Sequence, residues 1–371
     1  MGGSGDNPPL KILHIDPEKN WGGGEAQVFG LLGHLAARGH QNDLFAHPRG
    51  LLFARCRSLK VKTYPITMRN DLDLRCVTAL RKVIRELNYD MVHFHTKRAH
   101  TLALWLPHGK RRPKYVVTRR MDYPEARSWY THLLYNRRVD GVVAISKTIR
   151  DVLIRAGVDE NKIRVICSGI DPGIFENAKT KRALSESGSV VGCVAGLDER
   201  KGHHYLLEAA AILKAGGLKI QYKIAGDGPL RARLEEETAR LGLGDEVQFL
   251  GFVTDTAEFF SGIDIFAMPS LYEGLGVAAL EAMAAAKPVI ATRVGGLVES
   301  VLDDVTGVLV PPQDPTALAA AIAKVARSPG LAQSMGKQGR ERVRQQYSLE
   351  KTALENESYY HMLLGSSSKL N

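Results

Sequence analysis

The sequence predicts an α/β protein with two doubly wound, Rossmann-like domains that face a cleft. Three observations support this fold class. The chain has 371 residues, which is enough for two ordinary domains with a core each. Short apolar runs alternate with helix-like runs in two successive groups, a pattern typical of parallel sheets covered on both faces. An aperiodic stretch containing proline and glycine separates the two groups.

The first domain is predicted over residues 10–172. It begins with a strand over 11–15, a glycine loop over 22–24 and a helix over 25–38 that stops before a glycine. A second helix is predicted over 71–87, because apolar residues recur on one of its faces. Further strands are predicted over 91–94, 115–118, 141–145 and 163–166.

The second domain is predicted over residues 189–348, after a linker over 173–188. A last helix is expected over 349–364, and it can pack back on the first domain. The strands of the second domain are expected over 190–195, 220–225, 247–250, 263–268, 288–291 and 308–310. Its main helices are expected over 202–213, 230–241 and 277–286.

Composition favours a cytoplasmic enzyme without a membrane span. No run approaches the roughly 20 apolar residues that a spanning helix needs. The four cysteines are scattered without a Cys-x-x-Cys pair, which indicates reduced thiols and neither a zinc site nor a disulfide framework. Residues 1–9 and 365–371 are interpreted as loose ends outside the fold.

The positive charge is concentrated in the first half of the chain. Residues 1–175 carry 29 Lys and Arg against 16 Asp and Glu, or +13, whereas residues 176–371 carry 21 against 24, or −3. Such a split predicts an anionic partner for the first half: a phosphorylated acceptor, an anionic lipid surface or a nucleic acid. A lipid surface would place the protein at the inner face of the cell membrane.

The strongest motif is the segment 269–283, which puts a glycine-rich turn directly before a helix. The backbone amides at 274–276 are free donors at a positive helix end and suit an anionic diphosphate or sugar oxygens. Glu273 lies on the turn, and Glu281 lies within an otherwise apolar helix. A buried acid needs a partner, and a ribose diol would serve.

Three other signals at predicted strand ends are weaker. Gly23 and Gly24 allow a ligand to approach the backbone before a helix, although a flexible turn explains them equally well. Lys201 can neutralise a diphosphate or be simply solvated. His93 and His95 share one face of a strand, so the two could bind a metal ion, but no acid cluster accompanies them in the sequence. We expect His95 to contact donor or acceptor and His93 to be a core residue.

Over nearly its whole length the chain resembles a family 4 retaining glycosyltransferase of the GT-B fold. The resemblance depends on the order and spacing of several motifs together. These motifs are Glu273-x7-Glu281, Gly226-Asp227-Gly228-Pro229, Phe249-Leu250-Gly251-Phe252, Pro269-Ser270 and Val294-Gly295-Gly296.

The resemblance implies a nucleotide-sugar site in the second domain. Glu281 would bind the ribose, Glu273 the donor sugar, and Lys201 the diphosphate. The other residues that the resemblance assigns to the donor are Gly23, Gly24, Gly196, Gly226, Gly251, Phe252, Gly274, Leu275 and Gly276. The donor, most simply a UDP-sugar, is a co-substrate, and no cofactor is implied.

The sequence departs from the family pattern at two positions. Where the family commonly has Gly-Arg-Leu before its lysine, this chain has Ala195-Gly196-Leu197 and lacks the arginine. Where the family often has a histidine at the end of a strand of the first domain, Arg119 and Arg120 stand here. The run 119–124 resembles a subgroup tied to cell-envelope sugars, and Arg119 or Arg120 is expected to supply the missing charge to a bound phosphate.

The expected activity is transfer of a hexose-type sugar to an anionic or membrane-linked acceptor, such as lipopolysaccharide or another cell-envelope glycan. A GT-B-type nucleotide-sugar epimerase is the alternative enzyme. A nucleic-acid-binding function is a further alternative. It would leave Glu273 and Glu281 unexplained, and the sequence contains no recognisable nucleic-acid-binding motif. The densest basic run, residues 110–114, is expected to attract an anionic surface away from the cleft.

Donor binding should not require a divalent metal, because no Asp-x-Asp or His/carboxylate cluster lies near the turn at 274–276. We expect turnover to be the same with and without a chelator. An activity assay with EDTA, followed by addition of manganese or magnesium, checks this. Activity abolished by EDTA and restored by either ion would contradict it.

Overall fold

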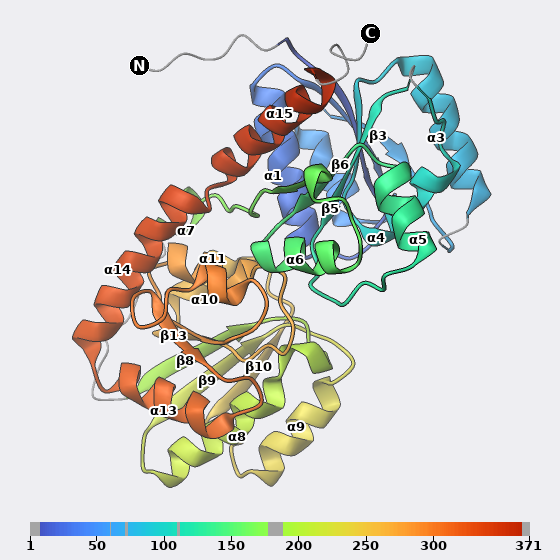
Figure 1. Ribbon diagram of the computed structural model, residues 1–371. Coiled ribbons are helices and arrows are strands. Elements are labelled where there is room, and N and C mark those ends of the chain that lie inside the picture. Colours follow the sequence, from blue (N-terminus) through green and yellow to red (C-terminus); the bar gives the residue numbers. More distant parts are fainter. Residues whose placement is uncertain (1–7, 60, 71–72, 110–111, 177–187, 366–371) are drawn as a thin grey trace, which may run out of the picture. The chain divides into compact units, whose positions relative to one another are not determined.

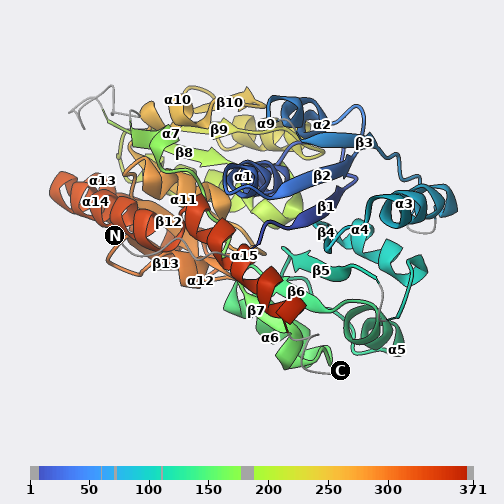
Figure 2. The ribbon, with the colours of Figure 1, turned by 90° about the horizontal axis from the view of Figure 1, so that it is seen from above.

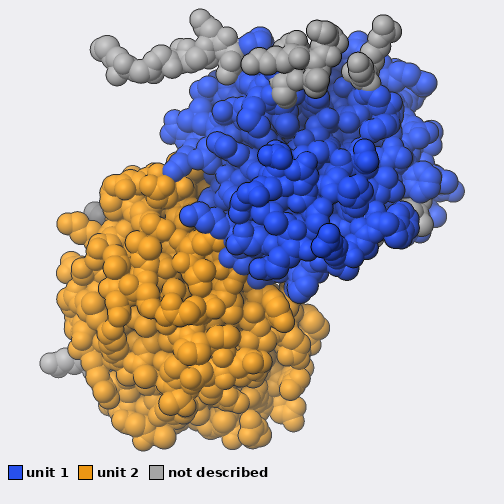
Figure 3. All heavy atoms as spheres, viewed as in Figure 1, with its two compact units in different colours: residues 1–168, 349–371 blue, residues 169–348 orange. Residues whose placement is uncertain are grey.

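The computed structural model describes residues 8–59, 61–70, 73–109, 112–176 and 188–365 (Figure 1). The chain divides into two compact units, which Figure 3 colours separately. Unit 1 comprises residues 1–168 and 349–371, and unit 2 comprises residues 169–348. Within the described residues, no helix combines the length and the apolar character needed to cross a bilayer.

Unit 1 contains a seven-stranded sheet in the order β3-β2-β1-β4-β5-β6-β7, with every neighbouring pair parallel. This is the strand order of a doubly wound dinucleotide-binding fold with one strand added. The strands are β1 (Lys11–Asp16), β2 (Gln41–Ala46), β3 (Lys62–Pro65), β4 (Met91–Phe94), β5 (Lys114–Arg119), β6 (Gly141–Ala144) and β7 (Ile163–Val165).

Helices cover both faces of this sheet. The helices of unit 1 are α1 (Gly23–Ala37), α2 (Leu51–Arg55), α3 (Leu74–Leu87), α4 (Lys97–Thr101), α5 (Trp129–Thr131), α6 (Lys147–Arg155) and α15 (Leu349–Gly365). Figures 1 and 2 show α1 and α15 on one side of the sheet and α3, α4 and α5 on the other. Helix α15, from the end of the chain, therefore completes the core of unit 1.

One face of this sheet is apolar under α1 and α15 and becomes polar toward the carboxyl ends of its strands. The parallel register pairs Ile12 with Met91 and His14 with His93. Because side chains alternate along a strand, the next positions on that face are Asp16 and His95. The apolar part is built by Leu10, Ile12, Leu31, Leu35, Met91, Val116, Val143, Ile166, Ala353, Tyr359 and Tyr360.

Unit 2 contains a six-stranded parallel sheet in the order β10-β9-β8-β11-β12-β13. Its strands are β8 (Ser189–Val194), β9 (Ile220–Ala225), β10 (Val247–Gly251), β11 (Ile265–Met268), β12 (Val289–Thr292) and β13 (Gly307–Val310). Its helices are α7 (Gly173–Glu176), α8 (His203–Ala215), α9 (Arg231–Arg240), α10 (Thr256–Ser261), α11 (Val277–Ala284), α12 (Leu297–Ser300), α13 (Pro315–Ala326) and α14 (Pro329–Gln346). The predicted α/β class with two Rossmann-like domains is confirmed.

The structure corrects several predicted elements of unit 1. Strands β2 and β3 were not predicted from the sequence. Strand β2 begins with Gln-Asn-Asp, and two of these polar side chains, Asn42 and Asp43, are nevertheless buried. Asp43 accepts a hydrogen bond from the Tyr89 hydroxyl at 2.5 Å. The predicted helix over 71–87 begins only at Leu74, where Asp73 caps it by accepting from the Arg75 amide.

The segments expected to be loose also differ in part. Gly23 and Gly24 are the first residues of α1 and not part of a loop. The predicted linker over 173–188 begins with the short helix α7, and its residues 177–187 lie outside the described residues. Residues 110 and 111 of the basic run lie outside them too.

Helix α14 packs closely on the end of α11, and Gly336 permits this contact. A methyl group at Gly336 would lie 2.0 Å from the carbonyl oxygen of Ala286, whereas one at Gly330 of the same helix meets nothing within 4 Å. We expect Gly336→Ala to lower the free energy of unfolding by about 1–3 kcal/mol, because the backbone must move apart. Gly330→Ala is the matched control and should be close to neutral. Urea unfolding followed by circular dichroism measures both, and equal stability of the two variants would contradict the prediction.

Candidate active site

In unit 2, the turn before α11 brings together two glycine motifs that are separate in sequence. Gly276 has φ 85° and occupies the N-cap position of α11 without a side chain to cap the helix. The Gly296 amide donates to the Glu273 carbonyl at 3.0 Å, and a methyl group at Gly296 would lie 2.2 Å from the Gly274 carbonyl oxygen. The first-turn amides of α11 are therefore held at a tight double turn, a geometry suited to an anion.

Lys201 and Glu273, 72 residues apart, form an ion pair at this turn. Lys201 Nζ lies 2.6 Å from Glu273 Oε2, and both side chains are mostly buried. The backbone fixes this approach, because the Leu271 amide donates to the Arg200 carbonyl at 2.7 Å. A diphosphate bound by Lys201 would therefore compete with Glu273 for the ammonium group.

Glu281 faces an apolar environment within α11. Burial raises the pKa of its carboxyl group to about 7. In the part of the chain that the structure describes, no hydrogen bond or ion pair reaches its side chain. A buried acid of this kind is stabilised by a ligand that donates hydrogen bonds to it.

Three predicted glycines follow the carboxyl ends of three adjacent strands. Gly196 follows β8, Gly226 follows β9, and Gly251 ends β10 with φ 70°. Gly226 has φ 139°, and a methyl group there would lie 1.8 Å from the Ala195 carbonyl oxygen, so only glycine fits. Phe252, next to Gly251, is 57% exposed. Ligands of doubly wound sheets bind at this edge.

In unit 1, Arg119 differs from the expectation of a free charge at a strand end. It is 5% exposed, and its guanidinium lies 3.3 Å from the Glu125 carboxylate and donates to the Tyr123 carbonyl at 3.2 Å. Arg112 belongs to the basic run 110–114 that was expected to attract an anionic surface, and for this residue the expectation is wrong. The Arg112 side chain is largely buried and pairs with Asp140 at 2.6 Å.

Arg120 lies beside the start of α1. A methyl group at Gly24 would lie 3.6 Å from Arg120 Cδ, so the arginine stem passes next to this glycine. Arg120 also donates to Ser168 Oγ at 3.4 Å. A small cavity of about 20 Å³, enough for one water molecule, is lined by Gln27, Leu31, Thr118, Arg120, Val143, Ile145, Ile166, Ser168, Thr352 and Asn356.

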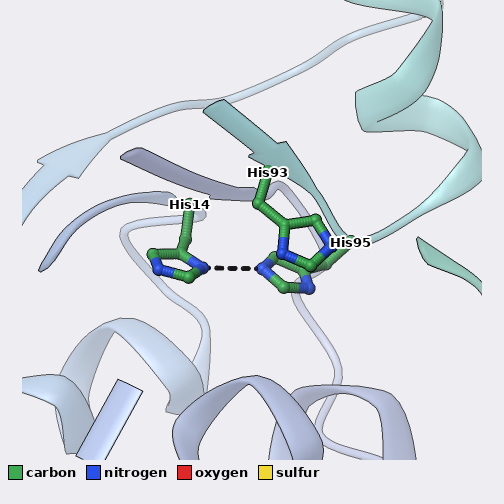
Figure 4. A group of neighbouring side chains, drawn as sticks. All are labelled: His14, His93 and His95. Atoms are coloured by element: carbon green, nitrogen blue, oxygen red, sulfur yellow. Dashed lines mark hydrogen bonds between the residues drawn. The ribbon is translucent and has the colours of Figure 1, made fainter. Parts of the chain in front are cut away.

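His95 belongs to a buried group of three imidazoles with His14 and His93, which come from β1 and the end of β4 (Figure 4). Asn42 Nδ2 donates to the His40 carbonyl, so Asn42 Oδ1 accepts from His14 Nε2 at 3.1 Å. His14 Nδ1 must then accept from His95 Nε2 at 2.9 Å. This order leaves a lone pair on His95 Nδ1, which is buried and has no partner among the described residues.

His93 connects this group to the end of the chain. Its Nδ1 lies 2.6 Å from the Tyr360 hydroxyl of α15, and its Nε2 lies 2.7 Å from Thr118 Oγ1. Burial lowers the pKa of His14 to about 4 and holds those of His93 and His95 well below the ordinary value. Both ring nitrogens of His14 and of His93 are engaged in hydrogen bonds, so the three neutral rings form a polar network.

Sequence reasoning missed Asp16 and Glu25, which lie at the same edge of the sheet. Asp16 is 1% exposed and accepts from the Glu18 amide at 3.1 Å. Burial, reinforced by the charge of Glu25, raises the pKa of Asp16 to about 7. Glu25 accepts from the Gly22 amide at 2.7 Å and closes the first turn of α1. The alternation of β1, which puts Asp16 two positions after His14, is the signal that would have found it.

The raised pKa of Asp16 predicts a pH-dependent stability. Between about pH 4 and 7 the folded chain keeps the Asp16 proton while the unfolded chain loses it, so this residue's contribution falls as pH rises, by up to about 1.4 kcal/mol per pH unit. Asp16→Asn should therefore be more stable than the parent at pH 8, and the gain should shrink toward pH 5. Asp151→Asn, at an exposed position, is the control. Urea unfolding at both pH values measures this, and a pH-independent difference would refute it.

Comparison with known proteins agrees with this architecture. Residues 174–342 match the family described as glycosyl transferases group 1, and residues 21–173 match glycosyltransferase family 4. An uncharacterized glycosyltransferase from Methanocaldococcus jannaschii is 28% identical over 298 residues, 74% of this chain and 76% of that protein. The lipopolysaccharide core biosynthesis glycosyltransferase LpsE from Rhizobium meliloti is 28% identical over 344 residues, 92% of this chain and 96% of LpsE.

Among solved structures, Anabaena HepE in complex with UDP and glucose has a TM-score of 0.82 at 21% sequence identity. The alignment covers 95% of this chain and 100% of that chain. Both units thus match glycosyltransferase families in sequence, and the chain shares the fold of the HepE structure. The chain belongs to the group 1 glycosyltransferases of the GT-B fold.

Proposed function

We propose that this glycosyltransferase moves a hexose-type sugar from a UDP-sugar to a membrane-linked glycan of the cell envelope, with retention of the anomeric configuration. The observation that carries the proposal is the ion pair of Lys201 and Glu273 at the uncapped start of α11. Glu281 lies within the same helix, and its side chain has no hydrogen bond or ion pair to any residue that the structure describes. The UDP and glucose named for HepE and the lipopolysaccharide core role named for LpsE support the donor and acceptor classes.

The transfer breaks the bond from the anomeric carbon to the diphosphate oxygen, which keeps the electron pair. A bond to an acceptor hydroxyl forms at the same carbon, and the hydroxyl proton leaves. Negative charge grows on the diphosphate in an oxocarbenium-like transition state. In this proposal Lys201 and the backbone amides of Leu275 and Gly276 stabilise that charge. Stabilisation of the leaving diphosphate should supply most of the rate enhancement. When Lys201 binds the diphosphate, its ion pair with Glu273 is exchanged, and the Glu273 carboxylate contacts the donor sugar.

Glu281 fits the ribose of the nucleotide. A carboxylate that accepts two hydroxyl donors is stabilised in its ionised form, which offsets the burial that raises its pKa. Gly251 and Phe252 would lie against the base, and Gly196 and Gly226 allow the diphosphate to approach the backbone. Gly23 and Gly24 stay predicted contacts of the donor phosphate, now as first-turn residues of α1.

A screen against nucleotide sugars tests the proposal. The full chain is incubated with UDP-, GDP- and ADP-sugars and a set of envelope glycans, and products are followed by mass spectrometry. We expect one nucleoside diphosphate to be released and one glycan to gain the mass of a hexose. Proton NMR of the anomeric centre then reports retention. Conversion of a nucleotide sugar into an isomer without transfer would favour an epimerase instead.

Glu281 and Glu273 should affect different steps. Glu281→Ala removes a hydrogen bond to a charged group at the ribose, typically about 1.5–3 kcal/mol, so UDP should bind roughly 10- to 100-fold more weakly. Glu273 lies at the turn that we place beside the reacting sugar, so Glu273→Ala should mainly lower turnover. Titration calorimetry with UDP and steady-state rates separate the two effects.

Glu236→Ala, on the exposed face of α9, is the control and should change neither quantity. The assignment of roles is wrong if Glu281→Ala and Glu273→Ala lose affinity and rate in the same ratio.

A further inference from the structure

Helix α3 of unit 1 has an apolar inner face and a strongly basic outer face. The residues that it buries are Cys76, Val77, Leu80 and Ile84. The exposed basic residues of its outer face are Arg75, Arg81, Lys82 and Arg85. Glu86 is the one acid in residues 74–87, so the helix carries a net charge of +3. The inner face holds α3 on the sheet, and the outer face presents its charge to the surroundings.

The positive charge of α3 is not neutralised within unit 1. In the part of the chain that the structure describes, no ion pair reaches any of the four basic side chains of α3. The predicted basic run 110–114 differs, because Arg112 and Lys114 lie 2.6 Å and 3.6 Å from the Asp140 carboxylate. The charge of α3 is therefore available to an external anionic partner.

Two of the three tryptophans are exposed in the same layer of helices as α3. Trp105 is 39% exposed, and its carbonyl accepts from Arg81 Nε of α3 at 2.7 Å. Trp129, the first residue of α5, is 77% exposed. Figures 1 and 2 show α3 and α5 on one side of the sheet. Protruding indoles beside unpaired cations are typical of a surface that contacts lipid headgroups.

The cations and the tryptophans extend to the ligand edge of unit 1. Helix α3 follows β3, and α5 follows β5. A helix that follows a parallel strand starts on the side where that strand ends, and ligands of doubly wound domains bind on this side. Arg75 and Trp129, at the starts of their helices, therefore lie toward the ligand edge.

We propose that unit 1 docks on an anionic phospholipid bilayer through this basic face. The basic face consists of Arg75, Arg81, Lys82, Arg85, Trp105 and Trp129. Its cations attract the lipid phosphates. Its indoles enter the headgroup region, which favours an apolar ring that carries one N–H donor.

This inference rests on the proposed function, because a bilayer contact beside the ligand edge suits an acceptor that is itself membrane-linked. It moves the attraction for an anionic surface from the run 110–114 to α3. A nucleic acid would be attracted by the same cations, and the experiment therefore includes one.

Co-sedimentation of the full chain with vesicles tests the inference. The vesicles contain phosphatidylcholine alone or equal parts of phosphatidylcholine and phosphatidylglycerol. We expect binding to the mixed vesicles at low salt and its loss at high salt, because salt screens the charges. The combined variant Arg75→Gln, Lys82→Gln and Arg85→Gln should bind roughly 100-fold more weakly, at roughly fivefold for each charge. Trp129→Ala should also bind more weakly and show a smaller blue shift of tryptophan fluorescence on the vesicles.

The matched control removes three exposed cations of unit 2 that form ion pairs. Its substitutions are Arg233→Gln, Arg240→Gln and Lys324→Gln. This control loses the same charge and should bind the mixed vesicles nearly as the parent does. Circular dichroism verifies that each variant is folded.

Undiminished vesicle binding by the α3 variant, an equal loss in the control, or tighter binding of the parent to a DNA duplex than to the mixed vesicles would overturn the inference. Calorimetry with UDP on the same preparation distinguishes the two proposals. Failure to bind UDP removes the proposed function, whereas UDP binding without binding to the mixed vesicles removes only the bilayer contact.

Discussion

Parallel strand pairing is the constraint on which the candidate site of each unit depends. Parallel strands deliver their carboxyl ends to one edge of a sheet, so residues far apart in sequence meet there. In unit 1 this edge holds Asp16, His95 and Arg120, from three adjacent strands. In unit 2 it holds the glycines after β8, β9 and β10 and the turn before α11. Short backbone contacts, such as the Gly296 amide on the Glu273 carbonyl, then set the fine geometry.

The second feature is burial of polar groups under a cover that comes from the other end of the chain. Helix α15 lies on the sheet of unit 1, and its Tyr360 hydroxyl reaches His93 at 2.6 Å. Unpaired polar groups in such a place would be costly, and the hydrogen-bond network of the three histidines offsets most of that cost. The network also orients the rings, and it leaves His95 Nδ1 without a hydrogen-bond partner among the described residues.

Electrostatics at the two edges differ from what composition suggests. The surplus of +13 in residues 1–175 describes a long-range field, and such a field can attract an anionic surface. At short range, however, Glu125 and Asp140 neutralise Arg119 and Arg112. Burial raises the pKa values of two acids, Asp16 and Glu281, to about 7.

The sequence by itself determined the alternation of strands and helices, the α/β class and the turn at 274–276, because these depend on local periodicity and on glycine. It also placed Lys201 after a strand, Glu273 on the turn and Glu281 within the helix that follows. It missed β2, whose polar Asn42 and Asp43 become acceptable inside only through distant partners. Only the tertiary structure decided that Lys201 pairs with Glu273 and that Arg119 is neutralised by Glu125. It also decided that His95 Nδ1 has no hydrogen-bond partner in the part of the chain that the structure describes. Charge pairing and tautomer choice depend on which groups lie within about 3 Å, and periodicity carries no information about that distance.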